Sequence, residues 1–517
     1  MKKFFLAALL LLFAAASFAE SPSKFASETG RYLVPVKKSS LKAGRESVCV
    51  LEQCYYIVDK ISAERSVMSG EAKEYYPEVI RRVFAAPNDS YFQDQWALQN
   101  SAINWLSGWE IIKDLPSTGS IPVVAVIDSG IAEHDDLLLS ALCGGEAHEA
   151  PYVFPVTNGF DEEGHGTHVA GIIGAFTDNY VGVASVSGSK VRVMSIRAAT
   201  PCSDGTSGCL SSPGILDAID QVLNKKMAGA PIVAVNMSFG SDEPSKPEFN
   251  AIKELRDHGI LAVAAAGNGD DHGVGQNLNN LNTYPAKYDL QNIITVAAVD
   301  NGLSLASYSN YGNIVGIAAP GGGGHYSPAI LSLGHTYSTP YASMSGTSMA
   351  APFIAGLLGA GVALYNKDKG SFTYPDITPA QLINILYSTA SAGSFGGKIE
   401  NNRLVDVNAF FQKMEVCRDD AINSGSACPQ AADTYPSKTN GFIPSGSDKT
   451  LTPPVTITYD PANDPCAAGV SLQRNEPGHD FGGCSLAAGD KGGVAALLLF
   501  LAIPLYIAVR RRLGAGL

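Results

Sequence analysis

The fold is decided by the stretch Ile121-Pro122-Val123-Val124-Ala125-Val126-Ile127, which is followed at once by Asp128-Ser129-Gly130. A continuous apolar run of this length predicts a strand that is buried on both faces, as in a parallel sheet covered by helices. Asp128 would then lie at the carboxyl end of the strand, where open α/β sheets hold their functional groups.

More apolar runs of strand length follow along the chain, and helical stretches separate them. The predicted strands are Val123–Ile127, within the first stretch, and Val191–Ile196, Ile232–Asn236, Ile260–Ala265 and Ile293–Val299; the helical stretches are Thr167–Phe176, Pro213–Met227 and Lys246–Asp257. This alternation predicts an α/β fold in which a mostly parallel central sheet lies between two layers of helices.

Two helices rich in small residues carry candidate catalytic side chains. His165 opens the run His165-Gly166-Thr167-His168-Val169-Ala170-Gly171, whose glycines allow close packing against neighbours. Ser348 lies in Gly346-Thr347-Ser348-Met349-Ala350-Ala351-Pro352, at the start of an apolar helix that reaches about Tyr365. The free N–H groups and the dipole at a helix start favour an anion, although serine is also a common helix cap.

The chain order Asp, His, Ser is that of the subtilisin triad. Two further blocks strengthen the match, Val235-Asn236-Met237-Ser238-Phe239-Gly240 and Ala264-Ala265-Ala266-Gly267-Asn268. Over roughly residues 87 to 412 the chain resembles the subtilisin-like serine proteases. The resemblance implies their three-layer α/β fold, an endopeptidase activity on protein or peptide substrates, and a small N-terminal α+β propeptide.

The resemblance also implies a role for each catalytic residue. Ser348 would attack the peptide carbonyl, His165 would take and return the proton, and Asp128 would orient the imidazole. Asn268 would donate its amide to the oxyanion together with the Ser348 backbone N–H.

Some residues near these motifs have alternative, non-catalytic interpretations. We expect His168, one turn after His165, to face the core and to be structural. Asn268 by itself could be a turn residue. Asp135 and Asp136 do not directly follow the strand, so we discount them as catalysts.

The family match also predicts a pocket for the substrate side chain before the scissile bond (the S1 pocket). Ser238, Phe239 and Gly240 would form one wall, Ala265, Ala266 and Gly267 the other, and Thr283 would lie near the floor. No carboxylate maps to that floor, so we expect a broad preference for apolar or aromatic residues. The insertion Gly269–Asn282 departs from the family, and its Asp270-Asp271-His272 is either a cation site or an exposed polar loop.

Structural Ca²⁺ is a further expectation from the resemblance. Asp89, Asp136 and Asn179 match the ligand positions of relatives, and carboxylate and amide oxygens suit a hard cation. The block His134-Asp135-Asp136-Leu137 is one residue shorter than usual. A net charge of −13 is compatible with bound cations and argues against nucleic acid as a partner. We expect a monomer.

The N-terminal region predicts export. Residues 1–19 combine two lysines, thirteen apolar residues from Phe4 to Ala16 and a small-residue cleavage site, which is typical of a signal peptide; an uncleaved anchor is the alternative. Residues 20–86 are assigned as the propeptide, or else as a permanent accessory domain. They contain the predicted strands Tyr32–Val36, Cys49–Leu51 and Tyr55–Val58 and a possible helix Ala72–Val83.

The C-terminal region predicts attachment to the cell envelope. Residues 413–490, rich in Pro, Ser, Gly, Asn and Asp, are assigned as a linker or stalk, with a small disulfide-tied module as the alternative. Residues 491–517 hold eighteen uncharged residues, Gly492–Val509, and then three arginines, as in a transmembrane helix with its basic end in the cytoplasm. With Cys484 just before it, this tail resembles bacterial sorting signals that a processing protease cuts; a permanent single-span anchor is the alternative.

The nine cysteines fit an exported protein. We predict Cys202–Cys209 as a disulfide, with Cys49–Cys54 and Cys417–Cys428 as plausible local pairs. Cys484 is the natural odd one, and Cys143 and Cys466 lack an obvious partner.

The sequence is compatible with three functions. A general serine endopeptidase fits all four catalytic positions. A narrow-specificity maturation protease for envelope proteins is the main alternative, and an inactive surface-binding scaffold is a further one. A lipase-type esterase is disfavoured, because the block around Ser348 lacks the second glycine of a G-x-S-x-G elbow.

Overall fold

The computed structural model describes residues 31–42, 45–50, 53–77, 86–115, 121–137, 161–202, 208–270, 272–324, 327–438 and 440–450. Four predictions fall outside these residues: the signal peptide, the linker beyond residue 450, the C-terminal segment 491–517, and the roles of Cys143, Cys466 and Cys484.

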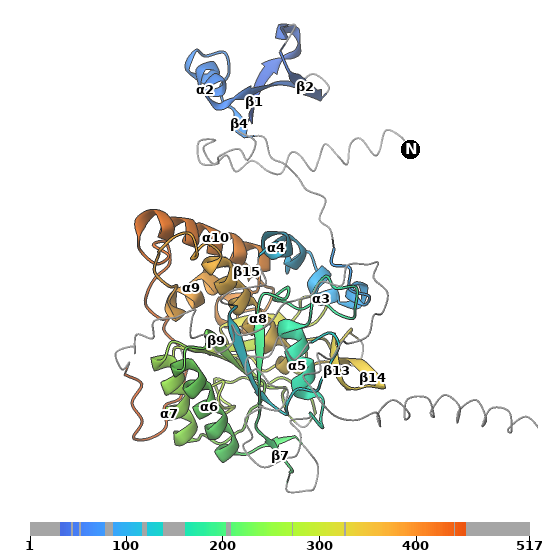
Figure 1. Ribbon diagram of the computed structural model, residues 1–517, viewed down its shortest axis with the longest axis vertical. Helices are drawn as coiled ribbons and strands as arrows, with labels where there is room; N and C mark the ends of the chain where they lie inside the picture. Colours follow the sequence, from blue (N-terminus) through green and yellow to red (C-terminus); the bar gives the residue numbers. More distant parts are fainter. Residues whose placement is uncertain are drawn as a thin grey trace, which may run out of the picture.

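A central sheet organises the larger part of the described chain (Figure 1). Its strand order is β15-β16-β12-β11-β10-β9-β5-β6, and all neighbours are parallel except β15 and β16. The strands are β5 (Val123–Asp128), β6 (Arg192–Arg197), β9 (Ile232–Met237), β10 (Leu261–Ala265), β11 (Ile293–Val299), β12 (Ile317–Pro320), β15 (Ser391–Ala392) and β16 (Arg403–Leu404). The five predicted strands are therefore confirmed, with ends within one residue.

Helices cover both faces of this sheet. One layer contains α3 (Trp96–Gln99), α4 (Trp105–Ile112), α5 (His165–Gly174), α8 (Thr347–Asn366), α9 (Pro379–Thr389) and α10 (Val407–Ser424), and the other contains α6 (Ser212–Met227) and α7 (Lys246–Asp257) (Figure 1). Side chains of β5 alternate between the layers, with Val124 and Val126 in the first core and Val123, Ala125 and Ile127 in the second. The all-apolar strand thus serves two cores, as a covered parallel sheet requires.

Local sequence signals explain where the outer helices begin. The Ser211 hydroxyl accepts a hydrogen bond from the Gly214 N–H at 3.2 Å, and the Ser245 hydroxyl accepts one from the Glu248 N–H at 3.3 Å. Each cap is followed within two residues by a proline, whose missing N–H costs nothing in the first turn.

Helix α8 is apolar all round because it lies inside the protein. Among the described residues it is the one helix long and apolar enough to cross a membrane, and 83% of its most apolar window is buried. Its composition is that of a core helix.

Residues 31–77 form a small unit of their own. Strands β1 (Arg31–Lys37), β2 (Ser47–Val50), β3 (Gln53–Asp59) and β4 (Tyr76–Pro77) pair in the order β2-β3-β1-β4, and α2 (Lys60–Met68) follows β3. Tyr32, Val34, Tyr56 and Ala63 are its buried core.

The helix predicted over Ala72–Val83 is wrong in its described part, because residues 72–75 are irregular and Tyr76–Pro77 joins the sheet. The missed signal is at Asp59, whose side chain caps α2 through the Ser62 N–H at 2.9 Å.

Shorter elements complete the described chain. They are the 3-10 turns Lys38–Ser40, Phe92–Asp94 and Glu400–Asn402, the hairpin β13 (Ile330–Thr336) and β14 (Thr339–Met344), and the pair β7 (Ala199–Thr200) and β8 (Cys209–Leu210). Disulfides join the three predicted cysteine pairs, Cys49–Cys54, Cys202–Cys209 and Cys417–Cys428.

Helix α10 continues through the boundary predicted at residue 412, and ends at Ser424. The chain beyond it, residues 425–450, lies against the domain and is called the C-terminal strap below. The Gln381 side chain bonds the Ala427 carbonyl at 2.8 Å, and Arg256 bonds the Lys449 carbonyl at 2.6 Å. The first part of the predicted linker is therefore packed.

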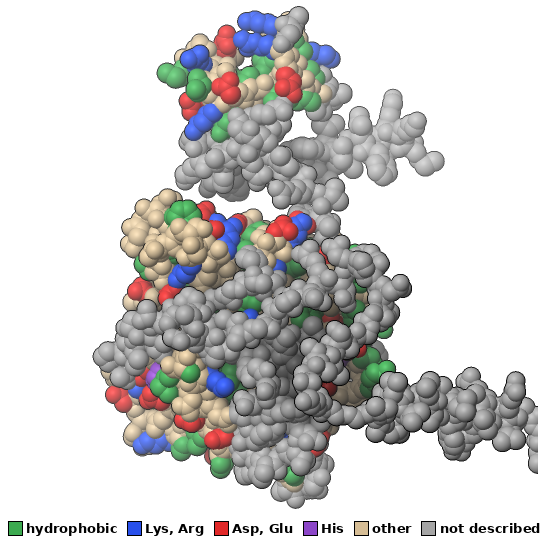
Figure 2. Space-filling view, in the orientation of Figure 1, with side chains coloured by type: hydrophobic (Ala, Val, Ile, Leu, Met, Phe, Trp, Pro, Cys, Tyr) green, Lys and Arg blue, Asp and Glu red, His purple; other side chains and the backbone are tan. Residues whose placement is uncertain are grey.

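Charges are mixed on the visible surface. Over the domain that carries the central sheet, acidic and basic side chains of the described residues are interspersed on the face drawn in Figure 2. That face offers no broad basic area among its described residues, as the acidic composition predicts.

Candidate active site

Asp128 and His165 come together at the carboxyl end of β5. The His165 Nδ1 atom lies 2.7 Å from Asp128 Oδ1. An ionised carboxylate can only accept, so Nδ1 carries the proton and Nε2 is left with its lone pair. Asp128 is buried while His165 remains partly exposed, with 33% of its side-chain surface accessible. This arrangement suits a base that must reach a substrate.

The environment of His165 raises its pKa. Burial alone would lower the pKa, but the charge of Asp128 and its hydrogen bond more than offset this, with smaller contributions from Asp161 and Glu163. An imidazolium at His165 would thus be favoured by the fixed negative charge of Asp128.

Two residues whose roles the sequence analysis did not predict, Ser129 and Asp161, hold Asp128 and His165 in place. Asp161 accepts hydrogen bonds from the Gly164 N–H at 2.8 Å and the Thr167 N–H at 2.8 Å, and so caps the start of α5. The Ser129 N–H bonds Asp128 Oδ1 at 2.8 Å, and the Ser129 hydroxyl accepts from the Gly166 N–H at 2.9 Å. An Asp shortly before a helix that opens on His is the signal that could have revealed the first contact.

The close approach of α5 to β5 depends on Gly166. A Cβ atom there would lie 2.1 Å from the Gly130 carbonyl oxygen, so no other side chain fits without movement. The packing role predicted for this glycine is confirmed.

Ser348 is the second residue of α8, and Pro352 sets its surroundings. Because proline has no N–H, the Ser348 carbonyl lacks its intrahelical donor. The Ser238 hydroxyl takes that place at 2.9 Å and in turn accepts from the Asn236 side chain at 2.9 Å. Ser238 therefore stabilises the first turn of α8, which carries Ser348. The sequence analysis did not predict this contact.

The Ser348 hydroxyl donates to the Ser238 carbonyl at 3.2 Å. No hydrogen bond joins this hydroxyl to His165 among the described residues, so attack by Ser348 would require its hydroxyl to rotate toward Nε2. Catalytic hydrogen bonds are often long or misaligned before substrate binds, and a serine rotation about χ1 is a small change.

The orientation of Asn268 follows from its neighbour Thr347. Asn268 Oδ1 accepts from the Thr347 N–H at 2.9 Å and from the Thr347 hydroxyl at 2.9 Å. Since a backbone N–H can only donate, the contact fixes which end is oxygen, and the amide Nδ2 is left as the free donor. That nitrogen lies on the side of Gly346, where a Cβ would be 3.3 Å away.

His168 faces the core, as expected. It is fully buried, and its Nε2 atom lies 3.0 Å from the Ile330 carbonyl and 3.1 Å from the Ala342 carbonyl. Burial lowers its pKa to about 4, so it is neutral and ties α5 to the β13–β14 hairpin.

The predicted S1 residues lie close together, but the side chain of Phe239 points away from the others. A Cβ on Gly240 would be 3.1 Å from the Thr283 methyl group, and one on Gly267 would be 3.2 Å from the same methyl. Thr283 therefore lies between the two predicted walls. The Phe239 ring packs instead against the core on the α6 and α7 side, so its side chain does not face the predicted pocket. Ala265 and Ala266, predicted for the other wall, are both buried.

The predicted calcium residues are close but not assembled around one point. Asp136 Oδ1 accepts from the Asn179 amide at 2.9 Å, so Asn179 presents nitrogen, and Asp89 accepts from the Asp178 N–H at 2.9 Å. Burial raises the pKa of Asp89 to about 6 and that of Asp136 to about 8, with the Asp89 charge adding to the second shift. Two buried carboxylates that repel each other suit a hard cation, provided that Asn179 turns its amide.

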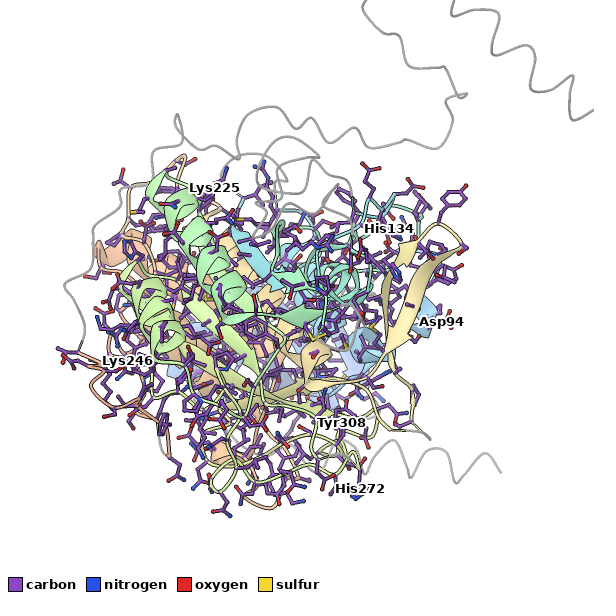
Figure 3. The ribbon with its side chains drawn as sticks, turned by 90° about the horizontal axis from the view of Figure 1, so that it is seen from below. Asp94, His134, Lys225, Lys246, His272 and Tyr308 are labelled. Atoms are coloured by element: carbon purple, nitrogen blue, oxygen red, sulfur yellow. A yellow bond between two sulfur atoms is a disulfide. The ribbon has the colours of Figure 1, made fainter. Side chains whose placement is uncertain are left out.

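Within the described residues, no group of three or more His, Cys, Asp or Glu side chains forms a metal site. His134 lies beside the β13–β14 hairpin (Figure 3), and its imidazole already has a hydrogen-bond partner, because Nε2 lies 2.5 Å from the Pro340 carbonyl. His272 lies at the outer rim (Figure 3), and Asp270 is used by the N–H groups of His272 and Val274. Asp270 and His272 are therefore part of an exposed polar turn, whereas Leu278 of the same insertion is buried in the core.

Comparison with known proteins identifies the family. A family model for the subtilases, Peptidase S8, matches residues 119–411, so the chain belongs to the subtilase family. It is similar to subtilisin DY of Bacillus licheniformis, with 35% identity over 270 residues that cover 52% of this chain and 83% of the relative.

Two further relatives are longer. The extracellular protease of Xanthomonas campestris pv. campestris is 32% identical over 65% of this chain and 57% of its own length. The thermophilic serine proteinase of Bacillus sp. strain AK1 is 34% identical over 54% of this chain and 61% of its own. The chain thus spans about three fifths of these relatives. A solved protease structure from Pseudoalteromonas arctica PAMC 21717 aligns with 64% of this chain and all of its own at 27% identity and a TM-score of 0.48.

Proposed function

We propose that this protein is an exported subtilisin-like serine endopeptidase. The observation that carries the proposal is the 2.7 Å contact between His165 Nδ1 and Asp128 Oδ1, with Ser348 at the start of α8. Family membership supports it, and so does the similarity to proteins named as extracellular and serine proteases.

The reaction follows from the residues. The Ser348 hydroxyl rotates away from the Ser238 carbonyl, gives its proton to His165 Nε2 and attacks the peptide carbonyl. The oxyanion receives the Asn268 amide and the Ser348 backbone N–H. His165 then protonates the leaving amine, and water hydrolyses the acyl-enzyme by the same route in reverse. Asp128 stays ionised throughout.

For specificity we propose a broad preference for apolar or aromatic side chains in S1. The Thr283 methyl between Gly240 and Gly267 supports this, since it offers an apolar surface to the end of the substrate side chain. The narrow-specificity maturation protease remains the alternative, and a cleavage profile on a peptide library separates the two.

We further propose one structural Ca²⁺ held by Asp89 and Asp136, with Asn179 after rotation of its amide. The supporting observation is the burial of both carboxylates, which are 5% and 0% exposed. The ion would neutralise their repulsion and fix the N-terminal end of the domain.

The location and maturation are also proposals. Residues 1–19 would direct export, residues 20–86 would be removed as a propeptide, and residues 491–517 would attach the protein to the bacterial envelope or be cut near Cys484. The three disulfides within the described part of the chain support an oxidising compartment.

The deciding experiment is casein hydrolysis by secreted protein, wild type against Ser348→Ala, with the chain mass followed by mass spectrometry. We expect hydrolysis and a shortened N-terminus in the wild type only. Equal hydrolysis by both proteins, with contaminating protease excluded, would refute the assignment of Ser348. Inactivity of both, with the propeptide intact, would point to a zymogen that needs an activator.

A further inference from the structure

The C-terminal strap pairs with the loop that follows Thr283. The Phe442 N–H donates to the Lys287 carbonyl at 2.8 Å, and the Phe442 carbonyl accepts from the Asp289 N–H at 2.9 Å. Two backbone bonds to alternate residues extend the loop like an added strand. The strap thus holds this loop through its main chain as well as its side chains.

The end of the strap is anchored beside the same loop. Lys449 Nζ lies 2.5 Å from Asp289 Oδ2. The buried Arg256 guanidinium, which pairs with Asp257 at 2.9 Å, also donates to the Lys449 carbonyl at 2.6 Å and the Thr450 carbonyl at 3.0 Å. Without the strap these buried donors would lose acceptors, which is costly for a charged group. The strap is therefore part of the folded domain.

Aromatic contacts connect the strap to the S1 region. The Tyr284 ring is 1% exposed, and its centroid lies 4.8 Å from that of Tyr288 and 5.4 Å from that of Phe442. The main chain of Tyr284 exchanges two hydrogen bonds with Ser241, at 2.7 and 2.9 Å. Tyr284 thus links Phe442 on one side to Thr283 and the wall before Ser241 on the other.

We infer that Phe442 is a positioning residue for the floor of the S1 pocket, and that the strap thereby sets the preference for large side chains. The inference rests on the proposed peptidase function and on the assignment of Thr283 to the floor. A large aromatic substrate side chain reaches the floor, whereas an alanine side chain ends above it. Loosening Tyr284 should therefore penalise only the large substrate.

The test compares two peptide p-nitroanilides that differ only in Phe or Ala before the scissile bond. The Phe442→Ala variant is expressed as the full chain and assayed after removal of the N-terminal unit. We expect its kcat/KM for the Phe substrate to fall roughly 3- to 10-fold, mainly through KM, and that for the Ala substrate to stay within about twofold. Phe442→Leu, which keeps an apolar contact, should recover most of the loss.

Tyr435→Ala is the matched control. Tyr435 lies on the same strap but packs against the core on the α8 side. Both alanine variants should lower the melting temperature, yet only Phe442→Ala should change the Phe/Ala ratio. Gly441→Ala provides a second perturbation, because its Cβ would lie 2.6 Å from the Asp289 Cβ and push the strap away while every aromatic ring is kept.

The outcomes separate the inference from the proposed function. An unchanged Phe/Ala ratio in folded Phe442→Ala and Gly441→Ala would overturn the inference, and so would an equal change in Tyr435→Ala. A wild type that hydrolyses neither substrate after removal of the N-terminal unit would refute the peptidase itself, and the inference with it.

Discussion

The orientation of Asn268, the proposed oxyanion donor, can be tested by replacing Thr347 with valine. The substitution keeps the shape of this fully buried side chain but removes its hydroxyl, which donates to Asn268 Oδ1 at 2.9 Å. Asn268 then keeps one of two hydrogen bonds, the one from the Thr347 N–H at 2.9 Å. Its amide becomes less firmly aimed at the oxyanion.

The size of the effect follows from the bonds that are lost. Loss of the whole amide donor costs about 100- to 1000-fold in kcat in subtilisin, or about 2.7–4 kcal/mol. Removing one of two tethers should cost about half of that free energy, so we expect kcat to fall roughly 10- to 30-fold. KM should stay within about twofold, because the oxyanion exists only in the transition state.

The assay is steady-state hydrolysis of a peptide p-nitroanilide, with enzyme concentration set by active-site titration. Thr347→Val also removes the acceptor of the Gly267 N–H at 3.0 Å, so the melting temperature is measured first and kinetics are run well below it. Thr347→Ser keeps the hydroxyl and should retain near wild-type kcat. A wild-type kcat in Thr347→Val, or an equal loss in Thr347→Ser, would refute the reasoning.

Three further predictions follow from the site. Ser348→Ala should lower kcat by about a millionfold, the loss known for subtilisin. Mass spectrometry should show that this variant keeps its propeptide, and a processed, active variant would contradict the prediction. Because Asp128 raises the pKa of His165 and only neutral His165 can accept a proton, kcat/KM should rise with pH through a midpoint above 6.5; a midpoint below 6.5 would disprove this. Chelation should lower the melting temperature, since Asp89 and Asp136 are buried and repel each other, and Asp136→Asn should lose most of the calcium response; an unchanged response in that variant would exclude Asp136 as a ligand.

Much of the fold could be predicted from local patterns. The run Val123–Ile127 is apolar at every position, so it had to be buried on both faces, and β5 indeed serves both cores. The helix Lys246–Asp257 was predicted to the residue, and the structure shows that the Ser245 cap and a proline in the first turn define its start. Where the pattern was weak, as in Ala72–Val83, the prediction failed and the capped helix at Lys60–Met68 was missed.

The candidate site was located by motifs, but its supports were decided by tertiary structure. Family blocks pointed to Asn268 and Ser348, yet only the folded chain orients the Asn268 amide through Thr347 and supplies the Ser348 carbonyl with the Ser238 hydroxyl. The physical reason is that a hydrogen bond between residues 79 or 110 positions apart leaves no local periodicity in the sequence.

The C-terminal strap is a further case in which contacts between residues distant in the sequence could not be predicted. Its composition, rich in Pro, Ser, Gly and Asn, is that of a linker, and the sequence by itself determined no more than that. Phe442 packs against Tyr284, and Arg256 donates hydrogen bonds to the carbonyls of Lys449 and Thr450. These contacts make the described part of the strap a component of the domain. Polar composition limits how much apolar surface a segment can bury, but main-chain hydrogen bonds need no particular side chains, so only the three-dimensional structure reveals them.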